Sequence, residues 1–247
     1  MPRPGVRPVL LIALLGAVLV AIAVLGCGGW DYLVWRFAER MSTADRLIQF
    51  APRVDPLWQA RCREVGLAYP PARVRLLALK AEKRLEVYAA NVGGPWQPLV
   101  SYPVLAASGG PGPKLCEGDN QVPEGFYRIA LLNPNSLFHV SLRVDYPNAQ
   151  DREQGRSDGR EHLGGDIMIH GGRASIGCIA IGDPAIEEVF TLAARCGLDH
   201  LDALLLPHDF RTRPADPAGV PPWMPARYRD LRALLGELPS APTIGAP

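Results

Sequence analysis

The pattern of hydrophobic and polar positions changes at Tyr69-Pro70-Pro71. Residues 30–66, before this point, contain few turn residues and have apolar positions at a helical spacing. After it, the apolar runs become short and are separated by turn residues, which is typical of strands. The sequence therefore predicts a helical stalk or small helical layer followed by a β-rich domain. The helical positions expected to face inward are Leu57, Trp58, Cys62 and Val65.

The β-rich part is divided by segments that break regular structure. Residues 108–113 contain so much glycine and proline that they predict a loop. Residues 146–165 are polar and glycine-rich, and they predict a long surface loop of a kind that often has a function. A turn is expected at residues 133–136. The predicted strands are residues 74–79, 85–90, 100–106, 126–132, 138–144, 166–170, 178–181 and 201–206.

One helix in this region has clear start and stop residues. Asp183 suits the N-cap, Pro184 the first helical position, and Gly197 the stop. The positions between them form an apolar stripe at helical spacing. A second helix is expected over residues 228–235, before a proline-rich tail. The predicted divisions of the chain are residues 1–29, 30–71, 72–210 and 211–247.

A long apolar segment stands at the N-terminus, where Arg3 and Arg7 precede an uninterrupted run from Val9 to Leu25. As a helix this run is slightly short of the ~30 Å hydrocarbon core of a membrane. One interpretation is an N-terminal apolar helix that stays as a signal anchor in the inner membrane. The other is a lipoprotein signal, in which Cys27 becomes the lipid-bearing first residue. Both interpretations place the remaining chain in the cell envelope, facing the periplasm, with the membrane as a partner.

Composition narrows the class of protein. The 26 basic and 25 acidic residues nearly balance, which argues against a dedicated nucleic-acid-binding protein. Glycine and proline each number 25, a turn-rich composition that favours a mainly β, α+β fold. The five cysteines cannot all pair with one another, although an oxidising envelope permits one disulfide among Cys62, Cys116 and Cys196.

The densest chemical pattern lies at residues 166–181, where a strand ends in His170 and a glycine-rich bend leads to Cys178. A cysteine nucleophile needs a base that takes its proton and later protonates the leaving group, and an imidazole suits both tasks. The bend contains Gly171, Gly172 and Gly177, which permit unusual backbone conformations and close approach of a substrate. The backbone amides of Gly177 and Cys178 are candidate donors to an oxyanion.

Two other interpretations of this pattern stay open on spacing alone. A histidine and a cysteine this far apart are common, and most buried cysteines are inert. Zinc is a rival, because His139, His162, His170 and Cys178 are all potential ligands. No pair of them has a familiar metal-site spacing, so no metal is expected.

The same segment resembles the signature of the L,D-transpeptidase catalytic domain, the YkuD-type family. The family pattern, HG followed after a short insert by S-x-G-C, is matched by His170-Gly171, Ser175 and Gly177-Cys178. Residues 112–127 resemble the loop and strand that precede the family's site. Residues 136–151, SLFHVSLRVDYPNAQD, resemble the YafK-like branch that includes the murein L,D-amidase type. The resemblance covers residues 74–207.

The resemblance implies a β-sandwich-like catalytic domain with a few helices and a thioester mechanism on cell-wall peptide stems. Cys178 would attack the L-centre of diaminopimelate, His170 would move the proton, and D-alanine or a lysine amine of an attached lipoprotein would leave. An amine acceptor gives an L,D-transpeptidase; water gives an amidase or carboxypeptidase of the same fold. A wall-binding module without activity is the third hypothesis.

Two positions depart from the commoner family pattern: Ile176 replaces a histidine and Ala180 replaces an arginine. Because that arginine often helps to place an acidic substrate, substrate recognition is expected to be rearranged. Lys114, Arg143 and Arg173 are the candidate replacements.

The remaining candidates each have two interpretations. Ser175 either hydrogen-bonds within the site or stabilises the bend, and His139 either faces the cleft or is a core histidine. Tyr146, Asn148 and Asp151 either line the substrate groove or form an Asx-type turn. Asp119 and Glu124 are turn residues more often than catalytic acids. The expected substrate-binding residues are Lys114, His139, Tyr146, Gly171, Gly172, Arg173 and Ser175.

Overall fold

The computed structural model describes residues 40–214 and 219–240, and from Met41 onward they belong to one compact unit. The predicted anchor and the lipidation site at Cys27 lie outside the described residues. No helix within the described ranges is both long and apolar enough to cross a membrane.

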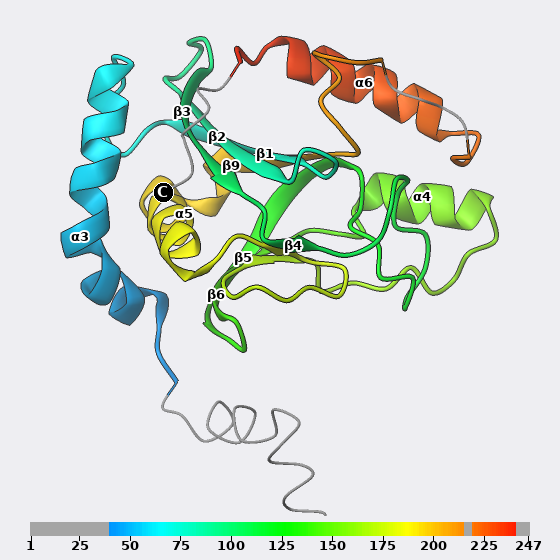
Figure 1. Cartoon of the computed structure of the whole chain (residues 1–247), viewed down its shortest axis with the longest axis horizontal. Helices are drawn as coiled ribbons and strands as arrows, with labels where there is room; N and C mark the ends of the chain where they lie inside the picture. The colour runs from blue at the N-terminus through cyan, green and yellow to red at the C-terminus, as the bar shows by residue number, and fades with distance from the viewer. Residues whose placement is uncertain (1–39, 215–218, 241–247) are drawn as a thin grey trace, which may run out of the picture. The chain divides into compact units, whose positions relative to one another are not determined.

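The described chain alternates strands with a small number of helices (Figure 1). The helices are α3 (Thr43–Glu64), α4 (Ala149–Ser157), α5 (Asp183–Cys196), the 3₁₀ helix η2 (Leu198–His200) and α6 (Met224–Gly236). The strands are β1 (Arg73–Leu79), β2 (Arg84–Ala90), β3 (Gln97–Pro103), β4 (Ala106–Ala107), β5 (Gly125–Ser136), β6 (His139–Val144), β7 (Met168–His170), β8 (Ile179–Ala180) and β9 (Leu201–Leu206).

All nine of these strands form one mixed sheet, in the order β3-β2-β1-β9-β5-β6-β7-β8-β4. The long strand β5 belongs to both halves: Gly125 to Arg128 pair with β9, and Ile129 to Ser136 pair with β6. The sheet therefore has two halves that are joined through one strand. This arrangement confirms the predicted α+β class.

The larger core lies on the face of the sheet that α3 and α5 cover, and it contains side chains from both sheet halves. Trp58 of α3 is fully buried there, and its indole Nε1 donates to the Glu188 carbonyl of α5 at 2.8 Å. Cys62, the next inward position, is also fully buried. Helix α3 is therefore a layer of the domain and not a stalk.

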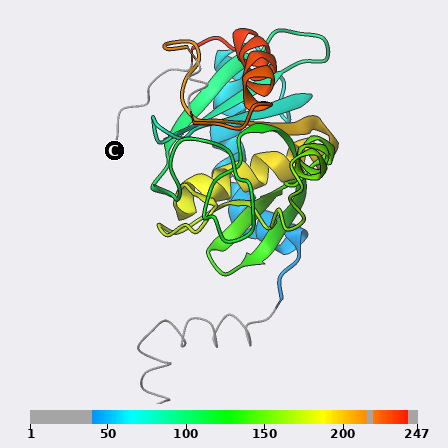
Figure 2. The same cartoon turned by 90° about the vertical axis from the view of Figure 1, so that its right-hand side faces the viewer.

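A second, smaller core lies between α6 and the opposite face of β1, β2 and β9. Figure 1 shows α6 on the side of these strands away from α5, and Figure 2 shows the same layers from the side. Tyr228 of α6 donates to the buried Glu124 carboxylate at 2.6 Å, and Lys80 forms an ion pair with the same carboxylate at 2.9 Å. Glu124 is thus a structural anion that ties α6 to the sheet.

Two local predictions are wrong. Strand β5 continues to Ser136, so the turn to β6 is at Leu137 and Phe138 and not at residues 133–136. The predicted loop 146–165 contains α4, because Asn148 and Asp151 form a reciprocal capping box at its start. This helix has no apolar stripe, since only Asp151 and Gly155 are buried, and a periodicity search therefore misses it.

The cysteines of the described part are all free thiols: Cys62, Cys116, Cys178 and Cys196. Cys62 is buried in the larger core, whereas Cys116 is exposed on a loop. The disulfide that an oxidising compartment permits is therefore not formed among them.

The burial of Trp58 gives a test of the role of α3. We expect Trp58→Ala to lower the free energy of unfolding by about 3–5 kcal/mol, because a large buried side chain leaves a cavity. The neighbouring Leu57 is 40% exposed, and Leu57→Ala should change it by only about 0.5 kcal/mol. Chemical denaturation measures both, and equal effects would mean that α3 is not a layer of the core.

Candidate active site

The candidate site is built on the bend between β7 and β8, which are parallel neighbours with His170 opposite Ala180. The Gly171 amide donates to the Phe138 carbonyl of the β5–β6 turn at 3.1 Å. A Cβ atom at Gly171 would lie 2.8 Å from this carbonyl oxygen and 2.4 Å from Asp183 Oδ1. Glycine is therefore required at position 171 by space, and the bend passes directly beneath the turn.

His170 is held rigidly at the end of β7. It is 2% exposed, and the Phe138 ring stacks on its imidazole with the ring centroids 4.8 Å apart. Its Nδ1 lies 2.6 Å from the Gly171 carbonyl oxygen. Because a carbonyl can only accept, Nδ1 carries the proton and Nε2 keeps its lone pair. Burial lowers the pKa of His170 below its ordinary 6.5, so the imidazole is neutral at pH 7.

The Cys178 thiol lies beside β7, one residue before β8. Its sulfur accepts a hydrogen bond from the Met168 amide at 3.4 Å and lies 3.6 Å from the Asp166 carbonyl oxygen. The side chain is partly exposed. Burial raises the pKa of the thiol above its ordinary 9.0, and the bond from Met168 opposes this shift. The resting pair is therefore a neutral thiol and a neutral imidazole.

Two serine hydroxyls hold the backbone next to the thiol. Ser175 Oγ accepts from the Cys178 amide at 3.1 Å and donates to the Cys178 carbonyl at 2.6 Å. Ser108 Oγ accepts from the Gly177 amide and donates to the Asn120 carbonyl at 2.8 Å. Both amides that were expected to bind an oxyanion thus have hydroxyl partners in this structure. Their oxyanion role stays a prediction, and it requires these hydroxyls to turn away.

Asp183 has a different role from the predicted N-cap. Gly182 is the N-cap of α5 and Asp183 is its first residue, with no side-chain cap bond. The Asp183 carboxylate instead accepts from the Gly172 amide at 2.7 Å, and it thereby holds the bend. The predicted stop at Gly197 is confirmed, since this residue is the C-cap with a φ of 88°.

Several predicted substrate-binding residues have internal partners. His139 Nε2 lies 2.7 Å from Glu187 Oε1, and Lys114 is paired with Asp119 at 2.7 Å. Tyr146 is buried and donates to the Leu163 carbonyl at 3.1 Å. The structure therefore gives these three side chains structural bonds of their own. Asp119 also accepts from three backbone amides, those of Leu115, Cys116 and Gln121, as expected of a turn residue.

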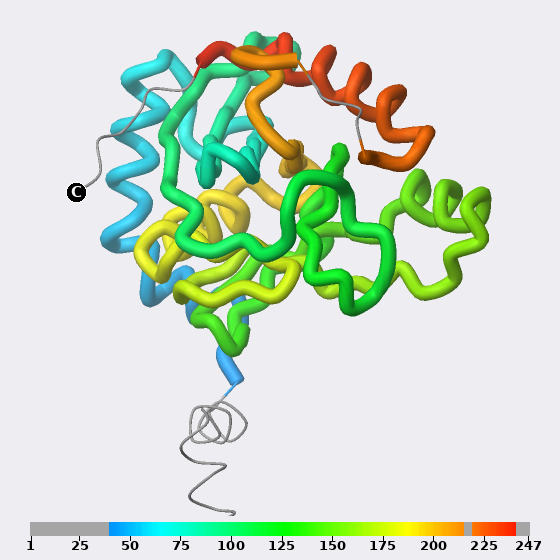
Figure 3. Tube along the Cα trace, turned by 45° about the vertical axis from the view of Figure 1, so that its right-hand side comes forward, coloured from blue at the N-terminus to red at the C-terminus, as the bar shows by residue number. Residues whose placement is uncertain are grey.

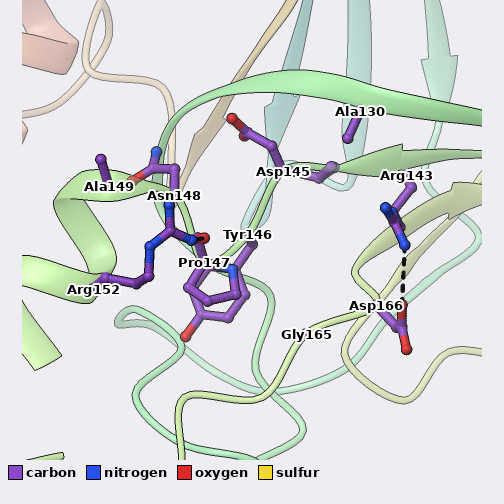
Figure 4. Close-up of a pocket in the computed structure, with 11 residues that line it drawn as sticks. Ala130, Arg143, Asp145, Tyr146, Pro147, Asn148, Ala149, Arg152, Gly165 and Asp166 are labelled. Atoms are coloured by element: carbon purple, nitrogen blue, oxygen red, sulfur yellow. Dashed lines mark hydrogen bonds and ion pairs between the residues drawn. The ribbon is translucent and has the colours of Figure 1, made fainter.

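A pocket of about 680 Å³ lies on the Asp166 side of the thiol (Figure 4). Arg143 and Asp166 face each other across its edge, with their charged atoms 3.8 Å apart. Asp166 also supplies the carbonyl that contacts the Cys178 sulfur. Asp166 is therefore part of both the pocket wall and the surroundings of the thiol.

A second pocket, of about 550 Å³, is lined in part by the bend itself. Gly172 and Arg173 contribute to its wall, together with Asp183 and Leu105. Arg143 and Arg173 thus line different pockets, and Lys114 lines neither.

Three residues of the site carry no recognisable sequence pattern. Phe138 covers His170, Ser108 binds the Gly177 amide, and Arg152 lines the larger pocket from α4. Their positions depend on strand pairing and on a helix that the sequence pattern does not reveal. β4, which precedes Ser108, pairs with β8, and Figure 3 shows these segments running side by side.

The zinc hypothesis has no support in the described ranges. No three His, Cys, Asp or Glu side chains of residues 40–214 and 219–240 gather as potential metal ligands. One ring nitrogen of each histidine already has a protein partner: His139 Nε2 bonds with the Glu187 carboxylate, and His170 Nδ1 bonds with the Gly171 carbonyl.

Comparisons with known proteins identify the family of the chain. The model of the YkuD family, the L,D-transpeptidase catalytic domain, matches residues 73–199. Two curated proteins called YafK carry a provisional L,D-transpeptidase designation, one from Escherichia coli K12 and one from Escherichia coli O157:H7. Each is 38% identical over 119 residues, which cover 47% of this chain and 46% of the relative. The chain thus spans about half the length of the curated relatives that it matches.

Solved structures show a more distant likeness. The helical cell shape determining protein Pgp2 of Campylobacter jejuni has a TM-score of 0.43 and 21% identity, covering 61% of this chain and 55% of that chain. Bd1075 of Bdellovibrio bacteriovorus has a TM-score of 0.40 and 20% identity, covering 68% and 57%.

The close approach at Gly171 gives one test of the bend. We expect Gly171→Ala to lower the free energy of unfolding by about 1–3 kcal/mol, because its Cβ would overlap the Phe138 carbonyl and the Asp183 carboxylate. Gly110→Ala is the matched control, since a Cβ there meets no atom within 4 Å. Thermal denaturation compares the two, and an unaffected Gly171→Ala variant would contradict this packing.

The protonation states give a second test. Since the pKa of the Cys178 thiol is raised, its alkylation by iodoacetamide should stay slow at pH 7 and increase through pH 9 and above. Peptide mass spectrometry separates Cys178 from the exposed Cys116. Full reactivity of Cys178 at pH 6 would reveal a thiolate–imidazolium pair instead.

Proposed function

Since the chain belongs to the YkuD family of L,D-transpeptidase catalytic domains, we propose that it is a peptidoglycan-modifying enzyme with Cys178 as nucleophile and His170 as general base. The observation that carries this proposal is the state of His170. Its Nδ1–H is fixed on the Gly171 carbonyl, so Nε2 is available as a base on the strand beside Cys178.

The first half of the reaction forms a thioester. His170 Nε2 takes the proton of the Cys178 thiol, and the thiolate attacks the carbonyl carbon at the L-centre of diaminopimelate in a peptide stem. The carbonyl oxygen gains the negative charge, and the Gly177 and Cys178 amides bind it once their serine partners turn away. The C–N bond then breaks, and His170 returns the proton to the leaving amine, which is D-alanine or the lysine of an attached lipoprotein.

The second half removes the acyl group. An acceptor amine gives its proton to His170 and attacks the thioester carbon, and the Cys178 thiolate leaves and recovers the proton. These two steps form a new peptide bond between the two stems, and they need no cofactor. The proposed location is the periplasmic side of the inner membrane, because the N-terminal apolar run suits an anchor there.

Hydrolysis is the second candidate, and one observation favours it. Ala180 is fully buried in the sheet, so the position that carries an arginine in the commoner family pattern presents no charge to a substrate or an acceptor. Water would then replace the amine in the second half-reaction, and the products would be a free carboxylate and the released amine.

Defined muropeptides test the proposal. The full chain is incubated with disaccharide tetrapeptides, and mass spectrometry follows new 3–3 crosslinks, which indicate transfer, and loss of D-alanine without crosslinks, which indicates hydrolysis. We expect Cys178→Ala to lower turnover at least about 10³-fold, because it removes the nucleophile. Cys116→Ser, at an exposed free thiol, is the control and should keep wild-type turnover. Equal turnover in Cys178→Ala and wild type would exclude the cysteine mechanism.

A further inference from the structure

The larger pocket beside the thiol carries charges of both signs. Arg143 and Asp166 lie at one end, and Arg152 enters from α4 at the other (Figure 4). Asp145 lines the wall between them. We call this space, lined by Arg143, Asp145, Asn148, Arg152 and Asp166, the charged pocket. Two guanidinium groups and two carboxylates make it close to neutral overall, so it suits a ligand that itself carries both charges.

Arg152 has capacity to bind an anion. Its Nη1 donates to the Pro147 carbonyl, and it makes no ion pair with any carboxylate of the described ranges. A guanidinium has five N–H donors in a planar fork, so most of its donors stay available for a carboxylate of a ligand. The exposed side chain of Arg152 is therefore a carboxylate-binding group without a carboxylate.

Among the described residues, Asp145 is a carboxylate without a cationic partner, just as Arg152 is a guanidinium without an anionic one. One carboxylate oxygen accepts from the Arg128 amide at 2.9 Å, and Asp145 forms no ion pair within residues 40–214 and 219–240. Burial raises the pKa of this carboxyl, so a nearby cation would relieve the cost of its charge. A ligand ammonium group carries a positive charge and three N–H donors, so it can bind this carboxylate.

The charged pocket shares one residue, Asp166, with the surroundings of the Cys178 sulfur. The Arg143–Asp166 pair at that end is loose, since the side chains are 43% and 85% exposed, and a ligand can replace it at small cost. The Asp166 carbonyl lies 3.6 Å from the Cys178 sulfur. A side chain that branches from the residue under attack would thus enter the charged pocket directly.

We propose that the charged pocket binds the zwitterionic end of a donor side chain, with its carboxylate on Arg152 and its ammonium on Asp145. The proposal rests on the function proposed above. It assigns these two side chains as the residues that distinguish a diamino diacid donor, such as diaminopimelate, from other donors. It also explains how a chain with alanine at position 180 discriminates an acidic donor. A lysine side chain, which has the ammonium alone, and a donor amidated at the distal carboxylate would both lose the bond to Arg152.

Binding to the full chain carrying Cys178→Ala tests the pocket without turnover. Isothermal titration calorimetry compares three tetrapeptide stems that end in D-alanine and differ only in the third residue: diaminopimelate, diaminopimelate amidated at the distal carboxylate, and lysine. We expect the diacid peptide to bind about tenfold more tightly than the other two, since one charge-assisted contact is lost in each. Arg152→Gln should erase this preference, and Asp145→Asn should weaken all three peptides by a similar factor.

Arg156→Gln is the matched control. Arg156 lies on the same helix, pairs with Glu153 and does not line the charged pocket, so its substitution should leave the preference intact. Equal binding of the three peptides, or a preference that survives Arg152→Gln, would overturn the proposal. Turnover of wild type is measured in parallel. A preference in binding without turnover would support the charged pocket and contradict the proposed catalytic function. Turnover of all three donors at one rate would support the catalytic function and contradict the charged pocket.

Discussion

β7 and β8 are parallel neighbours, although only the bend from Gly171 to Cys178 connects them. A parallel pair is normally joined by a crossover of about a dozen or more residues, often a helix. The short return is possible here because both strands are very short and because the bend fits beneath the β5–β6 turn. The Phe138 carbonyl and the Asp183 carboxylate hold its first two amides, and the positive φ of Gly177 turns the chain back into β8. The relative placement of thiol and imidazole depends on this constraint.

The same packing sets the chemistry of the resting site. The Phe138 ring and the sheet exclude water from His170, so the imidazole is neutral, and burial of the Cys178 sulfur keeps its proton on. A buried charge without a partner is costly, and the neutral pair avoids this cost. The hydroxyls of Ser108 and Ser175 satisfy the amides that would otherwise be left without partners.

The C-terminal helix contributes to the site from a distance. Arg227 of α6 forms an ion pair with Asp151 at 2.7 Å, and both side chains are almost fully buried. Asp151 also caps α4, the helix that carries Arg152. Because a buried charge is costly once its partner is lost, this pair fixes α4 against α6. The region matched by the family model ends at residue 199, so a helix beyond that region positions one wall of the charged pocket.

The sequence by itself determined the class of fold and most strands, and it pointed to the two residues on which the proposed site is built. Leu201–Leu206 is apolar except at Asp202 and is a strand as predicted, because a strand buried in a sheet is recognisable from its apolar composition. His170, Gly171 and Cys178 form a local pattern, which is why they were recognisable without coordinates.

Only the tertiary structure decided which charged groups are available. Lys114 and Arg143 were both candidate replacements for the missing arginine, but Lys114 is paired with Asp119, whereas Arg143 lines a pocket together with Asp166. α4 was missed because it buries no apolar stripe, and Arg152 was missed with it. Asp183 bonds to the bend instead of capping its own helix, because the Gly172 amide is brought within 2.7 Å of its carboxylate. The partner of a polar side chain depends on distance in space, and a local pattern carries no information about it.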